Sequence, residues 1–164
     1  MADTAPTFTA PPFPTLILDD DAGFWRGPLA LGGTTPEVTL YVDASLSEAS
    51  YASAKELLAE LTSLQQRARE GIIDAAGKES EGVDGFFAFF RDELPEALPE
   101  ALRGEAPAEA LTSALMLCGV ALHSDHEGSF DLTLDFTFGR EHSDELLAVR
   151  FSPTGELCDV SHES

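Results

Sequence analysis

Lysine and arginine are scarce in this chain of 164 residues. Nine basic residues stand against 30 aspartate and glutamate residues, so the formal net charge is −21. Binding to nucleic acid or to an anionic membrane needs clustered basic side chains that neutralise phosphates. We therefore expect neither among the partners of this protein. Attraction to a basic protein partner is one interpretation of the charge. The acidic composition of the proteome from which the chain comes is the other, and it is favoured because net charge reports on solubility and association and not on a specific function.

Cysteine is almost absent as well. Cys118 and Cys158 lie 40 residues apart, and no CxxC pair or cysteine-rich framework surrounds them. Such sparse cysteines are typical of a protein in a reducing compartment. The N-terminus has no basic head followed by an apolar run, and no apolar run is long enough to span a membrane. We expect a cytoplasmic protein.

Motifs for catalysis or cofactor binding are also missing. The sequence contains neither HExxH nor GxSxG. Asp19, Asp20 and Asp21 could hold a divalent cation, but Gly23 is misplaced for a calcium-binding loop. We interpret the three aspartates as a solvated turn. No catalytic residue and no cofactor is predicted.

The N-terminal residues predict an extended leader followed by a short series of strands. Residues 1–14 contain four prolines, which block a helix and remove backbone donors. We assign 1–14 as a proline-rich leader and 15–164 as one domain. Apolar alternation predicts strands at 15–18, 24–26 and 37–43.

Helices are expected in the middle of the chain. Ser45 and Glu48 have the spacing of a capping box, and Gly77 is a plausible stop for the helix that follows. Shorter helices are expected at 83–93 and 107–114. One stripe of the long helix is apolar: Leu57, Leu61, Leu64, Ala68 and Ile72.

The last third of the chain predicts strands. Residues 130–138 alternate strictly between apolar and polar side chains, which indicates a half-buried strand. A second alternation, through Met116, Cys118, Val120 and Leu122, predicts another, and strands at 147–151 and 156–160 follow. We therefore predict an α+β fold in strands–helices–strands order. Its sheet is expected to be antiparallel, with the helices packed on one face.

Four histidines fall in the last 42 residues, and carboxylates flank them. Imidazole and carboxylate are ligands for zinc or iron, so a metal site is one interpretation. Its candidate ligands are His123, His126, His142 and His162. The other interpretation is that these are ordinary polar turn residues, because their spacing matches no known metal motif. His142, Ser143 and Asp144 could likewise suggest a hydrolase, but adjacent residues in a turn favour a structural cap.

A phenylalanine-rich segment runs from Phe86 to Phe90. Four phenylalanines in five residues cannot share one helix face, so most are expected in the core. One or two could contact a partner, because aromatic side chains are enriched at interface centres. Trp25, Phe86 and Phe90 are the candidates.

The end of the chain follows a recognisable order of features. They are an aromatic strand with Phe136, a Ser143-Asp144 turn, an apolar strand ending at Phe151, a hairpin at Gly155 and a terminal Glu163-Ser164. This order resembles the closing pattern of a bacterial family described only as domain of unknown function 2004. The resemblance implies no catalytic residues, because that family has no established activity. It marks Ser143, Asp144, Glu163 and Ser164 as pattern positions, either as turn caps or as parts of a shared site.

Two functional hypotheses follow. The first is a non-catalytic binding or immunity-type protein of bacteria, whose acidic surface acts on a basic protein partner. The alternative is a small enzyme or metal-binding protein that uses the C-terminal histidines and carboxylates.

Overall fold

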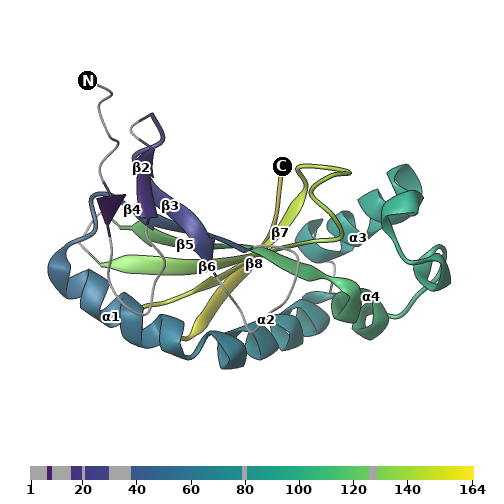
Figure 1. Cartoon of the computed structure of the whole chain (residues 1–164). Coiled ribbons are helices and arrows are strands. Elements are labelled where there is room, and N and C mark those ends of the chain that lie inside the picture. Colours follow the sequence, from purple (N-terminus) through teal and green to yellow (C-terminus); the bar gives the residue numbers. More distant parts are fainter. Residues whose placement is uncertain (1–6, 9–15, 20, 30–37, 79–80, 126–128) are drawn as a thin grey trace, which may run out of the picture.

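The computed structural model describes residues 7–8, 16–19, 21–29, 38–78, 81–125 and 129–164. They form one sheet, and the helices come between its fourth and fifth strands along the chain (Figure 1). The strands lie side by side in chain order. They are β1 (Thr7–Phe8), β2 (Leu16–Asp19), β3 (Phe24–Leu29), β4 (Val38–Asp43), β5 (Met116–Ser124), β6 (Phe130–Thr137), β7 (Leu146–Phe151) and β8 (Leu157–Glu163). The helices are α1 (Glu48–Ala59), α2 (Leu61–Ala75), α3 (Glu81–Glu93) and α4 (Ala108–Ala114), with 3-10 turns η1 (Pro95–Ala97) and η2 (Glu100–Leu102).

The sheet is mixed, which corrects the expectation of an antiparallel one. β4 and β5 are parallel, with Tyr41 opposite Ala121, and every other neighbouring pair is antiparallel. A parallel pair needs a long crossover, and the helical segment between β4 and β5 provides it. The α+β class is confirmed. Thr7–Phe8, inside the predicted leader, pairs with β2 and so belongs to the sheet.

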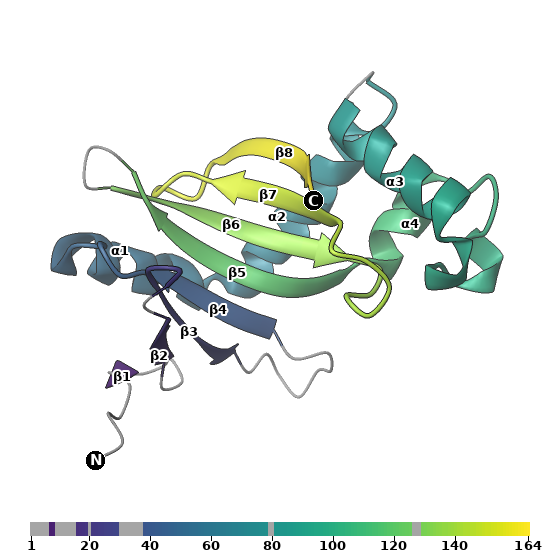
Figure 2. The ribbon, with the colours of Figure 1, turned by 90° about the horizontal axis from the view of Figure 1, so that it is seen from above.

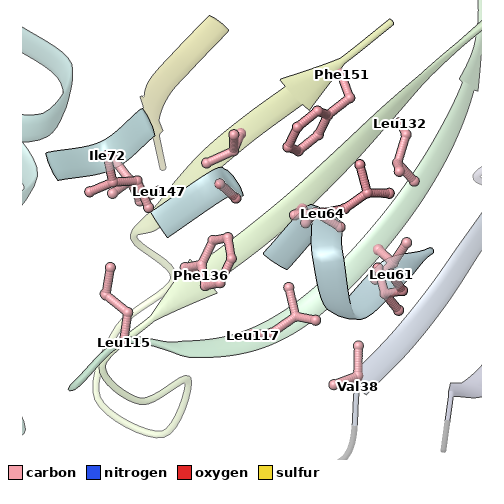
Figure 3. Close-up of a cluster of buried hydrophobic side chains, with 14 of the residues drawn as sticks. Val38, Leu61, Leu64, Ile72, Leu115, Leu117, Leu132, Phe136, Leu147 and Phe151 are labelled. Carbon is pink, nitrogen blue, oxygen red and sulfur yellow. The ribbon is translucent and has the colours of Figure 1, made fainter. Parts of the chain in front are cut away.

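One face of the sheet is covered by α1 and α2 (Figure 1). The predicted apolar stripe is confirmed, since all five of its residues are buried. It meets the apolar positions of the strands, among them Phe136, Leu147 and Phe151 (Figure 3). Removing this much apolar surface from water is the main source of stability. The period of two along each strand then turns the alternate residues toward the opposite face.

Helix α3 packs mainly against the edge strand β8, with a smaller contact to β7. Its Gly82 comes so close that an added Cβ would lie 3.4 Å from the carbonyl oxygen of Val160 and 3.5 Å from the backbone nitrogen of His162. The expectation of helices on one face therefore holds for α1 and α2, whereas α3 lies at the β8 edge of the sheet.

The predicted capping box at Ser45 is wrong. Ser47 is the N-cap of α1, and its side chain accepts a hydrogen bond from the backbone N–H of Ser50. Ser45 is engaged elsewhere, because its N–H and its hydroxyl both donate to Asp43, over 2.9 and 2.6 Å. The single long helix is also wrong, since Glu60 separates α1 from α2.

Asp43 ties the end of β4 to the end of β5. Its second carboxylate oxygen accepts a hydrogen bond from the backbone N–H of Ser124, over 3.0 Å. Partial burial acts to raise the pKa of Asp43, but the hydrogen bonds from Ser45 and Ser124 outweigh it and the pKa is lowered. The parallel pair is thus held where the chain turns into α1.

We predict that Asp43→Asn lowers the free energy of unfolding by about 2 kcal/mol near pH 7, because an amide cannot accept all three bonds. A lowered pKa stabilises the folded chain above the ordinary value of 3.8, and this contribution is lost as the pH falls through the folded pKa. The two proteins should therefore converge in acid. Urea denaturation tests this, with exposed Asp144→Asn as the control. Equal stabilities of wild type and Asp43→Asn near pH 7 would contradict the tie.

Candidate functional site

The sheet face opposite α1 and α2 is the candidate site, and Figure 2 looks onto it. Neither α1 nor α2 covers this face, and the loop between β6 and β7 rises beside it (Figure 1). We call it the open face. Strand register places the following residues on it: Thr39 and Tyr41 of β4, Gly119, Ala121 and His123 of β5, Asp131, Thr133 and Asp135 of β6, Leu146, Ala148 and Arg150 of β7, and Asp159, Ser161 and Glu163 of β8.

A bulge in β5 determines what lies at the centre of this face. Leu117 pairs with Phe136, whereas Gly119 pairs with Asp135, so Cys118 is the extra residue. The bulge therefore interrupts the regular alternation expected from Met116 through Cys118 to Val120. The Cys118 thiol is buried and donates to the backbone oxygen of Asp135 over 3.3 Å. Burial is the main cause that raises the pKa of this thiol to about 11, so it is an inert thiol at neutral pH.

Small residues surround Asp135 and make a hollow. Gly119 and Ala148 are its partners on the two neighbouring strands, and Ser161 follows in the same row. An added Cβ on Gly119 would lie 3.0 Å from the Asp135 Oδ2 atom. The carboxylate therefore lies over a glycine that has no side chain to displace it.

Two pockets meet at Asp135. One, of about 290 Å³, lies toward β3 and is lined by Phe24, Tyr41, Ala121 and His123 together with Asp19, Ala22 and Arg26. The other, of about 490 Å³, extends toward β8 and is lined by Thr133, Leu146, Ala148, Arg150, Asp159, Ser161 and Glu163. His123 and Asp135 line both, so the two pockets adjoin at these residues and together form the depression of the open face.

Asp135 is the most perturbed carboxylate on this face. Burial raises its pKa to about 6, the positive charge of Arg140 opposes the rise, and the carboxylate of Glu163 adds to it. The two basic residues of the pocket walls face other carboxylates, since Arg26 lies 3.5 Å from Asp19 and Arg150 lies 3.6 Å from Asp131. Within the part of the chain that the structure describes, no hydrogen bond or ion pair reaches the Asp135 carboxylate.

The structure does not gather the predicted histidines. His123 lies on the open face, its ring edge to face with Phe24 at 5.5 Å. His142 lies 3.6 Å from Glu141 in the β6–β7 loop. His162 points to the helix side, pairs with Glu145 and packs on the ring of Phe86. His126 lies outside the described residues, and among those described no group of three or more histidine, cysteine or acidic residues could hold a metal.

The residues marked by the family resemblance have mainly local partners. Ser143 accepts a hydrogen bond from the backbone N–H of Glu145 over 3.1 Å, which caps the turn before β7. Asp144 and Ser164 are exposed. Glu163 accepts a hydrogen bond from Ser161 over 2.7 Å and lines the larger pocket. Of the four, Glu163 alone lines the depression.

The predicted aromatic contacts are wrong for Phe86 and Phe90. Both side chains are 0% exposed and pack with Phe138, at ring distances of 5.8 and 5.1 Å. Trp25 is half-buried and packs against the core. The expected turn at Asp19 is supported, because the backbone N–H of Gly23 bonds to the Asp19 carbonyl oxygen and Gly23 has φ of 71°. Asp20 lies outside the described residues.

Sequence reasoning missed Phe24, Tyr41, Gly119 and Asp135 as members of a site. One signal was present, namely a glycine in an otherwise apolar strand, which often marks a bulge or a close approach. Asp135 had no such signal, because the alternation of β6 only assigned it to the exposed set.

No family model, curated protein or solved structure matches this chain. The resemblance to domain of unknown function 2004 therefore stays a prediction. Among the described residues, no helix is long and apolar enough to cross a membrane.

We predict that Asp135→Asn is more stable than wild type by about 1–2 kcal/mol near pH 7, after allowance for partial exposure. The folded pKa of about 6 exceeds the ordinary 3.8, so the contribution of Asp135 to stability is full below 3.8 and is lost as the pH rises through 6. The isosteric amide does not titrate. Denaturation of both proteins across this range tests the difference, and parallel pH profiles would contradict the assigned environment.

Proposed function

We propose that this protein is a non-catalytic, immunity-type binding domain whose open face receives a basic protein partner. The observation that carries the proposal is the depression centred on Asp135, a partly buried carboxylate with no bonded cation among the described residues. A buried charge is costly unless it is paired, so a cation from a partner would complete this site.

Charge around the depression supports the same partner. Asp159 and Glu163 of β8, two strands away from Asp135, line the larger pocket together with it, and the whole chain carries a net charge of −21. Such a field accelerates the encounter with a positively charged protein and repels nucleic acid. Cys118 and Cys158 are both free thiols, in keeping with the cytoplasmic location that we expect.

The alternative, a metal-binding protein or small enzyme built on the C-terminal histidines, has less support. His123, His142 and His162 have three different surroundings, and no described group of ligands is placed to share a metal. No observation favours it over binding.

We predict that a fluorescent peptide of alternating lysine, arginine and glycine binds the open face. Asp159→Asn/Glu163→Gln should weaken binding by about fivefold or more at about 50 mM salt, because two carboxylates beside the depression lose their charge. Fluorescence anisotropy measures the affinity, which should also fall as salt rises.

The matched control is Glu56→Gln/Glu93→Gln, which removes the same charge from exposed positions on the helices. This control should bind the peptide nearly as well as wild type. Equal weakening by both double variants would show diffuse attraction to an acidic protein and would contradict a site on the open face.

A further inference from the structure

The smaller pocket beside Asp135 is small for a ligand site. Its volume of about 290 Å³ lies at the lower limit of pockets for small molecules, which begin at about 300 Å³. It opens on the same face as the larger pocket, so a protein docked on the open face passes over both.

The walls of this pocket are aromatic and apolar. Phe24 comes from β3, Tyr41 from β4, and Ala121 and His123 from β5. The edge-to-face contact between Phe24 and His123 fixes one corner of the wall. Aromatic rings attract cations through the negative charge on their faces.

Asp135 brings a negative charge to this pocket, and Gly119 leaves the space in which its carboxylate lies. Asp19, the other carboxylate that lines the pocket, faces Arg26. The positive charge of Arg140 also acts on Asp135, but it forms no ion pair with this carboxylate among the described residues. A single cationic group that bonds directly to the Asp135 carboxylate is the chemistry that matches these aromatic walls.

A guanidinium group suits this pocket better than an ammonium group. It is flat, so it can stack on a ring while it forms two parallel hydrogen bonds to a carboxylate. It is also more weakly hydrated than an ammonium group and loses less on entering an apolar pocket. Resting on the proposed function, we infer that the pocket formed by Phe24, Tyr41, His123 and Asp135 receives one arginine side chain of the basic protein partner.

Binding of this arginine is coupled to the proton on Asp135. The Asp135 carboxyl group has a pKa of about 6, and only its ionised form pairs with a guanidinium group. The titratable and charged groups around it are Tyr41, Cys118, His123, Arg140, Arg150, Asp159 and Glu163, and Asp19 and Arg26 also line the smaller pocket. The affinity for the arginine side chain should therefore fall about tenfold between pH 7 and pH 5, as the ionised fraction of Asp135 falls.

The probe is N-acetyl-arginine amide at millimolar concentrations. Its binding is measured by NMR from the chemical shifts of the backbone amides of the protein. The expected result is saturable binding with shifts at Tyr41, Ala121 and Asp135. The citrulline analogue, of the same shape but uncharged, should bind at least about tenfold more weakly, since it lacks the charge-assisted bonds. Equal binding of the citrulline analogue would overturn the inference, and equal binding of the lysine analogue would overturn the choice of arginine.

Two variants locate the probe. Asp135→Asn should weaken it by about tenfold or more, and so should Gly119→Ala, whose methyl group would lie 3.0 Å from the Asp135 Oδ2 atom. The matched controls are Glu56→Gln and Gly85→Ala on α3, where an added Cβ has only an ordinary contact of 3.9 Å. Unchanged binding in Asp135→Asn would overturn the inference. Denaturation curves establish that each variant is folded.

The two proposals fail in different ways. If the basic peptide binds the open face but the arginine amide does not bind, or binds without Asp135, the arginine pocket is wrong and the protein-binding function stands. If the affinity for the peptide is also unchanged in Asp159→Asn/Glu163→Gln, the proposed function itself is wrong.

Discussion

Each strand from β4 to β8 turns one side toward the core, and the rest of the molecule depends on this constraint. Because side chains alternate along a strand, burying Val38, Leu40 and Val42 against the helices commits Thr39 and Tyr41 to the other face. The same holds for β6, where Phe136 is buried and Asp135 is turned outward. The composition of the open face is thus largely the complement of the core.

The centre of that face departs from simple alternation, and the departure creates its chemistry. The bulge at Cys118 shifts the phase of β5, so that Gly119 and not a larger residue lies beside Asp135. Asp135 then has a raised pKa, and as a charged group it opposes folding near neutrality. An asparagine at this position would not weaken the fold in this way. A destabilising charged residue is characteristic of a binding site, where stability and function are commonly in conflict.

Much of the fold could be predicted from local pattern. The burial of the stripe from Leu57 to Ile72 and of one side of β6 could be read from the sequence, because the apolar residues recur with the helical and the strand period respectively. The parallel pairing of β4 with β5 could not be predicted, since it joins residues separated by the whole helical segment. The cap at Ser47 was missed because Asp43, in the preceding strand, engages Ser45. The site was missed for a related reason: Phe24, Tyr41, Gly119 and Asp135 come from four strands, and only the register brings them together.

Gly82 has a consequence for how this protein behaves at high concentration. An edge strand offers unpaired backbone groups to any other chain, and is a starting point for intermolecular sheet growth. The missing side chain of Gly82 lets α3 lie directly against the backbone of β8 at Val160 to His162, so this stretch of the edge is shielded. Nearer the start of β8, a second bulge at Cys158 breaks the regular register that another strand would need. One glycine in a helix and one irregular residue in a strand therefore protect the C-terminal edge of the sheet from self-association.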